Sequence, residues 1–99
     1  MKNNNSIGQS VLSHIQESLK DQAFNKHYHR AKIISEISQK VYELRIKSGL
    51  SQTEIAKKAE TTQPVIARLE SGKDKRIPSI ELLDKIASAT GSSLNISFN

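Results

Sequence analysis

Two stretches of the N-terminal half place apolar residues three and four positions apart, the spacing of one face of an α-helix. Leu12, Ile15 and Leu19 predict one short amphipathic helix, whose stripe packs either on its own domain or on a partner. A second stripe predicts a longer core helix over residues 30–48, which Gly49 stops. The second stripe consists of Ile33, Ile34, Ile37, Val41 and Leu44.

Three shorter helices are predicted after this point, each from its own start signal. Residues 51–54 read Ser-Gln-Thr-Glu, a capping box that begins the first of them. Thr62 is the expected N-cap of the second, and Gly72 ends it. The third follows the Pro78-Ser79 pair and runs to Gly91.

The last residues alternate between apolar and polar side chains, which is the period of a half-buried β-strand. Leu94, Ile96 and Phe98 form the apolar set. Because a lone strand is not stable and strand edges seek partners, we expect this strand to pair with its twin in a symmetric homodimer. The pattern therefore predicts an all-α fold with an N-terminal arm over residues 1–29, a compact helical bundle over 30–91 and a C-terminal strand over 92–99.

Charge and composition narrow the class of partner. Lys and Arg number 15 against 10 Asp and Glu, a net charge of +5 that favours polyanions. Aromatic residues are only 4% and Trp is absent, so duplex DNA is a better target than a single strand that must be stacked. The chain has no cysteine, no apolar run near the ~20 residues of a membrane span and no secretion signal, which predicts a cytoplasmic protein without a membrane partner.

The histidines raise the question of a metal site or a catalytic base. His27 and His29 form an H-x-H pair, and His14 stands earlier in the arm. No cysteine accompanies them, and no carboxylate stands at ligand spacing, so surface histidines are the better interpretation. The chain also lacks a glycine-rich phosphate loop and a nucleophile constellation. We therefore expect no metal, no cofactor and no enzyme activity.

The second of the three short helices has two distinct faces. Val65, Ile66 and Leu69 cluster on one side, as a core-facing side requires. The opposite face holds Gln63, Pro64, Ala67, Arg68 and Ser71. Two short helices joined by a tight turn in a basic helical domain are the layout of a helix-turn-helix, and such a face can read adenine through glutamine and guanine through arginine. The alternative is that Gln63 and Arg68 are ordinary solvated residues.

Arg45 and Glu70 form a second constellation. Arg45 follows Val41 by one turn and Glu70 follows Ile66 by one turn, so each charge lies at the edge of an apolar helix face. An arginine–carboxylate fork would tie the core helix to the recognition helix, and we predict that the two residues pair. The alternative is that both side chains extend separately to solvent.

The run SGLSQTEIAKKAETTQPVIARLESGKDKRIPS, with LLDKIASATG after it, resembles the Cro/cI-type helix-turn-helix, or XRE family, of phage repressors and many bacterial antitoxins. The resemblance covers residues 41–91 and implies that Gln63, Pro64 and Arg68 face bases. Phosphate contacts are implied for Gln52, Thr62, Lys75 and Arg76. Lys73 lies in the same basic loop, and we expect it to join the phosphate contacts.

The chain departs from that motif at Glu60, where the turn commonly has glycine. If the turn requires a left-handed residue, glutamate costs about 1–2 kcal/mol there. Pro64 cannot donate a hydrogen bond from its groove-facing position, so fewer bases are read directly and DNA shape matters more.

The flanks LKDQAFNKHYHR and GSSLNISF are similar to HigA-like antitoxins of type II toxin–antitoxin pairs, which neutralise RelE/HigB-type ribonuclease toxins and repress their own operon. The resemblance implies an autorepressor that binds an inverted-repeat operator as a homodimer. It also implies a toxin-binding arm formed by Leu12, Ile15, Leu19, Phe24 and Tyr28. A HipB-like antitoxin of a kinase toxin and a stand-alone phage-type repressor remain the alternatives.

Overall fold

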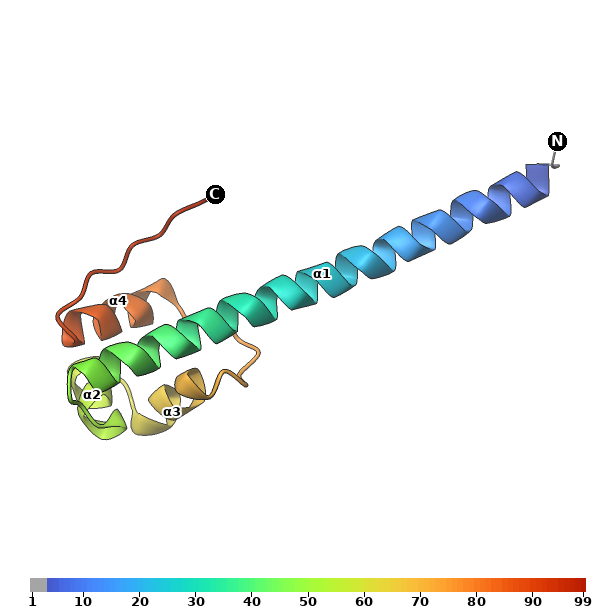
Figure 1. Ribbon diagram of the computed structural model, residues 1–99. Coiled ribbons are helices and arrows are strands. Elements are labelled where there is room, and N and C mark those ends of the chain that lie inside the picture. The colour runs from blue at the N-terminus through green and yellow to red at the C-terminus, as the bar shows by residue number, and fades with distance from the viewer. Residues whose placement is uncertain (1–3) are drawn as a thin grey trace. The chain divides into compact units, whose positions relative to one another are not determined.

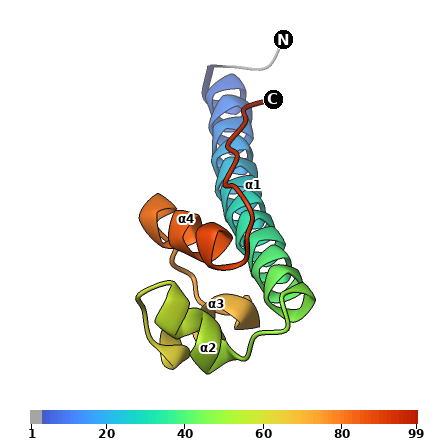
Figure 2. The ribbon, with the colours of Figure 1, turned by 90° about the vertical axis from the view of Figure 1, so that its left-hand side faces the viewer.

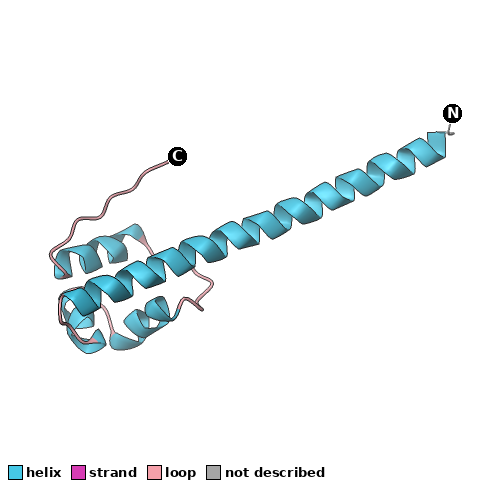
Figure 3. Cartoon of the chain, in the orientation of Figure 1, coloured by secondary structure: helices cyan, strands magenta, loops and turns pink. Residues whose placement is uncertain are grey.

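The computed structural model describes residues 4–99 and is helical in every regular element of that range (Figures 1 and 3). Residues 1–3, the beginning of the predicted arm segment, lie outside the described residues. The elements are α1 (Asn4–Lys47), α2 (Gln52–Lys58), α3 (Gln63–Ser71) and α4 (Ile80–Ala89). The expected all-α fold with a helix-turn-helix is thus confirmed.

The chain divides into two units, one that ends at Lys32 and one over residues 33–99. In the first unit, the described residues belong to α1, and every side chain from Ser10 to Lys32 is exposed. The short separate helix predicted around Leu12 is therefore wrong, because α1 continues without a break. The physical reason is that no glycine or proline interrupts the chain between Gly8 and Gly49, so nothing in the sequence stops the helix.

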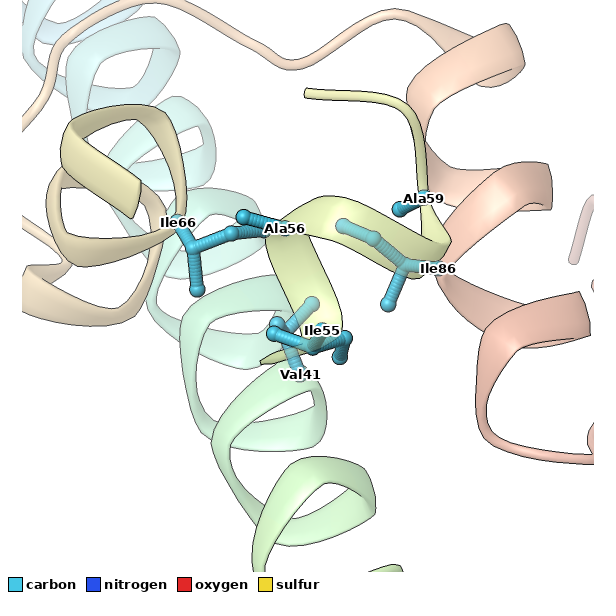
Figure 4. Packing of buried hydrophobic residues seen from close by; sticks show 6 residues of the cluster. All are labelled: Val41, Ile55, Ala56, Ala59, Ile66 and Ile86. Atoms are coloured by element: carbon cyan, nitrogen blue, oxygen red, sulfur yellow. The ribbon is translucent and has the colours of Figure 1, made fainter. Parts of the chain in front are cut away.

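The second unit buries a small core to which four helical segments contribute (Figure 4). Figure 2 shows α2, α3 and α4 grouped at the C-terminal end of α1. The buried cluster consists of Val41, Ile55, Ala56, Ala59, Ile66 and Ile86. Ile37 and Leu69 pack against it, whereas Ile33, which belongs to the same predicted stripe as Ile37, remains 45% exposed. The predicted stripe is therefore buried only from Ile34 onward.

Helix ends follow the local signals in the sequence. The capping box is present: the Glu54 amide donates to Ser51 Oγ and the Ser51 amide donates to Glu54 Oε1, both at 3.0 Å. Thr62 is the N-cap of α3, although its side chain makes no capping hydrogen bond. Gly72 ends α3 with φ of 68°, a left-handed conformation that suits glycine.

Glu60 lies in the turn between α2 and α3 and has φ of 57°. The turn of the helix-turn-helix therefore does require a left-handed residue, and glutamate holds it at a cost of about 1–2 kcal/mol. The turn supplies hydrogen-bond donors to carbonyl groups at the end of α2. The Glu60 amide donates to the Lys57 carbonyl, and the Thr61 amide donates to the Ala56 carbonyl. The departure from glycine strains the turn locally and leaves the motif intact.

The predicted C-terminal strand is not an element of the described chain, in which residues 92–99 have no regular secondary structure. A strand is defined by hydrogen bonds to a neighbouring strand, and the described residues offer this segment none. Leu94 is half-buried, whereas Ile96 is 57% exposed and Phe98 is 97% exposed. The segment therefore carries two large apolar side chains that the single chain does not cover.

Candidate nucleic-acid interface

Helix α3, the predicted recognition helix, has a buried side and an exposed side. Ile66 is fully buried, and Val65 and Leu69 are half-buried beside it. The opposite side carries the exposed residues Gln63, Pro64, Arg68 and Ser71, with Ala67 partly covered. An amide and a guanidinium among small residues form a surface that can approach base edges closely.

Gln52 of α2 connects the start of the recognition helix to its end. The Gln63 amide donates from Nε2 to Gln52 Oε1 at 2.9 Å, and Gln52 donates from its own Nε2 to Glu70 Oε1 at 3.2 Å. Gln52 is only partly exposed, so its amide is held on both sides. The orientation of Gln63, a predicted base-reading residue, is therefore coupled to the interior of the domain.

Arg45 and Glu70 lie together in the interior as a two-point ion pair. Arg45 donates from Nε to Glu70 Oε2 at 2.6 Å and from Nη2 to Glu70 Oε1 at 2.9 Å. The two side chains are 12% and 5% exposed. Arg45 also donates from Nη1 to the Leu50 carbonyl at 3.0 Å, so the fork ties α1, α3 and the segment before α2 to one another. Because both side chains are largely desolvated, loss of either member leaves the other charge without its ionic partner.

The same hydrogen bond to Glu70 raises the pKa of Arg45 above its ordinary value, although burial acts in the opposite direction. The Arg45 guanidinium also lies 5.5 Å from the centroid of the Tyr42 ring, a cation–π distance. The charge of Arg45 is thus stabilised from two directions.

The loop after the recognition helix carries the predicted phosphate-binding cations. Lys73, Lys75 and Arg76 are all exposed there, and Thr62 is exposed at the other end of α3. The loop also contains Asp74, which is not among the site residues predicted from the sequence. Asp74 accepts from Arg76 Nε at 3.1 Å and from Arg76 Nη2 at 3.0 Å. The aspartate two residues before an arginine in a loop is the signal that could have revealed this pair.

The predicted arm residues do not share one face. Leu12, Ile15 and Leu19 are 59%, 49% and 58% exposed, and Ile15 and Leu19 line a shallow groove on one side of α1. At 100° per residue, Phe24 and Tyr28 lie about 140° and about 180° around the helix from Leu19. Tyr28 instead meets its neighbour His29 edge to face, with ring centroids 5.9 Å apart. The arm therefore presents two separate apolar surfaces.

Among the described residues, no three histidine or carboxylate side chains gather as metal ligands would. No described helix combines the length and the apolar character that crossing a membrane requires.

The sequence of the C-terminal unit matches a known family model. Residues 41–96, more than half of the chain, match the helix-turn-helix family model. The chain belongs to the Cro/cI-type helix-turn-helix family. Proteins of this helix-turn-helix family are DNA-binding regulators, so the chain is a sequence-specific DNA-binding transcription regulator, and α3 is its recognition helix. No solved structure matches the chain.

Proposed function

We propose that this helix-turn-helix protein is a cytoplasmic bacterial antitoxin that also represses its own operon, acting by binding and not by catalysis. It binds an inverted-repeat operator as a homodimer and neutralises a RelE/HigB-type ribonuclease toxin. The observation that carries the DNA-binding half is the exposed face of α3, which presents Gln63 and Arg68 beside a loop rich in positive charge. The observation behind the antitoxin half is an N-terminal helix whose apolar side chains are uncovered.

In this proposal two polar residues on the exposed side of α3 read bases. Gln63 pairs with adenine, Arg68 pairs with guanine, and Pro64 packs against the groove without donating a hydrogen bond. The Gln52–Gln63 hydrogen bond supports this role, because it fixes the Gln63 amide before DNA arrives. Phosphates are bound by Gln52, Thr62, Lys73, Lys75 and Arg76, which fix the register of the protein on the duplex.

Selection of a preferred duplex from a random pool, followed by binding titrations, tests the reading of bases. Arg68→Ala is expected to relax discrimination at one base position by about 1–3 kcal/mol. Lys75→Ala, the control, is expected to weaken binding to all sequences alike and to lower the salt slope. An Arg68→Ala variant that keeps the full sequence preference would contradict the assignment.

Homodimerisation is assigned to the tail. Leu94, Ile96 and Phe98 of one copy pair with the same segment of the second across a two-fold axis, which gives the segment the neighbouring strand that a single chain lacks. The dimer would place two recognition helices about 34 Å apart, in successive major grooves. Sedimentation of the wild type should give a dimer and that of Ile96→Asp a monomer. A monomeric wild type would overturn this assignment.

We assign toxin binding to the arm. One contact surface consists of Leu12, Ile15 and Leu19, and a second consists of Phe24 and Tyr28. Co-expression with the product of the adjacent gene and a mass measurement of the purified complex test this. A double variant, Ile15→Glu with Leu19→Glu, should lose the complex and keep DNA binding. Asn25→Glu should keep both, because this exposed position lies at least about 60° around the helix from every residue of the two surfaces.

The identity of the adjacent gene product separates the alternatives. A RelE-like product supports the ribonuclease antitoxin, and a kinase supports the HipB-like alternative. A neighbour of neither kind, with no complex formed, supports a stand-alone repressor.

A further inference from the structure

Asp74 lies where the basic loop meets the recognition helix. A pocket of about 240 Å³ is lined there by Arg68, Asp74 and Arg76, above apolar side chains that include Val65 and Leu69. The Asp74 side chain is 25% exposed, whereas that of Arg76 is 72% exposed. The carboxylate is therefore turned toward the protein, and the guanidinium that it holds lies at the surface.

Three hydrogen bonds join Asp74 to Arg76. Besides the two side-chain contacts from Nε and Nη2, the Arg76 backbone amide donates to Asp74 Oδ1 at 3.0 Å. The carboxylate thus occupies one edge of the guanidinium in the two-point geometry that arginine also uses for a phosphate. A backbone phosphate that approaches this edge must replace Asp74.

The charge of Asp74 persists under all conditions in which DNA binding is measured. Its hydrogen bonds with Arg76, together with the positive charge of Arg76 and the more distant charge of Arg68, lower the pKa of Asp74 from 3.8 to about 2. A carboxyl whose pKa is lowered on folding keeps its ion pair at every pH above its ordinary pKa. Asp74 therefore loses its pair with Arg76 only as the pH falls through about 2. At neutral pH the loop therefore carries three cations and one permanent anion.

We propose that Asp74 is an internal competitor of DNA phosphate for Arg76 and so limits the affinity of the protein for DNA of any sequence. This inference rests on the proposed phosphate contacts of the loop. Affinity that does not depend on sequence comes almost entirely from neutralised phosphates, so withholding one cation lowers it selectively. Protein that binds random DNA less tightly is retained less by the excess of non-operator sites.

The test compares Asp74→Asn with the wild type on a random-sequence 20-base-pair duplex between 50 and 200 mM KCl, by fluorescence anisotropy. Asparagine keeps an acceptor for the Arg76 backbone amide and removes the charge. The variant is expected to bind up to about eightfold more tightly at 0.1 M salt, with a salt slope steeper by about 0.9, the contribution of one added phosphate contact.

Asp84→Asn is the matched control, because it makes the same change in net charge at an exposed carboxylate of α4 that does not line the pocket. It should change the affinity less than twofold and leave the slope unchanged. In an Arg76→Ala background, Asp74→Asn should have no more effect than the control. Circular dichroism of each variant verifies that the helices are retained.

Two outcomes overturn the inference. If Asp74→Asn behaves like Asp84→Asn, the carboxylate does not compete, and if it weakens binding, Asp74 assists the contact of Arg76 instead. A separate result would contradict the phosphate contacts of the proposed function. If Arg76→Ala and Lys75→Ala both leave the affinity and the slope unchanged, the loop does not contact phosphates.

Discussion

The two units of the chain have the same helical spacing of apolar residues, and they differ in whether other side chains cover the apolar face that results. In the C-terminal unit, apolar positions of α1, α2, α3 and α4 meet in a core where Ile55 and Ile66 are fully buried. In the N-terminal unit, Leu12 and Leu19 follow the same spacing and remain 59% and 58% exposed. The difference teaches that periodicity specifies a helix and the direction of its apolar face, whereas burial requires a second element with a complementary face. The arm has such an apolar face, and the side chains of that face are exposed.

The largest loss of stability is expected at the ion pair between Arg45 and Glu70 in the C-terminal unit. Glu70→Ala leaves the Arg45 guanidinium, 12% exposed, without its carboxylate, and should lower the free energy of unfolding by about 3–5 kcal/mol. Urea denaturation followed by circular dichroism measures it. The control is Glu81→Ala, which removes an ion pair whose carboxylate is 79% exposed and should cost less than about 1 kcal/mol. Equal losses would mean that burial does not set the strength of the Arg45–Glu70 pair.

Sequence reasoning succeeds where a structure depends on neighbours along the chain. Ser51, Thr62 and Gly72 mark helix ends because capping involves residues within one turn, and the α3 faces follow from the fixed 100° step. Arg45 and Glu70 lie 25 positions apart, yet each could be placed at the edge of an apolar face that had to meet the other.

Reasoning fails where an element depends on the conformation of a loop or on another chain. The fork between Asp74 and Arg76 exists only because the loop turns the aspartate inward, which no periodicity records. The tail has the alternation of a strand, but hydrogen bonds from a neighbour are needed to make it one. The stripe of Leu12, Ile15 and Leu19 predicted one short helix in the arm, yet a helix that no glycine or proline interrupts continues past the end of its stripe.

A smaller effect is expected at the start of α2. Ser51→Ala removes the hydroxyl that accepts from the Glu54 amide and should cost about 1 kcal/mol of stability in urea denaturation.

Hydrogen bonds with Ser51, above all from its backbone amide and next with its side chain, lower the pKa of Glu54 from 4.5. The contribution of the Glu54 charge is therefore present above pH 4.5 and lost as the pH falls. The stability difference between the wild type and Glu54→Gln should shrink in that direction, and a difference that grows would contradict the capping role.

The strained turn should respond in the opposite direction. Glu60→Gly relieves about 1–2 kcal/mol of left-handed strain at φ of 57° and costs about 0.5–1 kcal/mol through the greater entropy of the unfolded chain, so a net gain of up to about 1.5 kcal/mol is expected. Thermal denaturation measures the gain as a rise in Tm. Glu60→Ala serves as the control, since alanine keeps the strain and should give no gain. A Glu60→Gly variant less stable than the wild type would show that the glutamate side chain contributes more than its backbone costs.

The smallest effect is expected in the arm and bears most directly on the comparison. Leu19→Ala removes an apolar side chain that is already 58% exposed, so the free energy of unfolding should change by less than about 0.5 kcal/mol. Ile66→Ala, which empties a fully buried position, should cost about 2–5 kcal/mol in the same urea titration. If Leu19→Ala were nearly as costly, its stripe would be buried in the protein in solution, by a second copy or by its own domain. Repeating the titration over a tenfold range of protein concentration separates these two causes, because only a stripe covered by a second copy makes the loss depend on concentration.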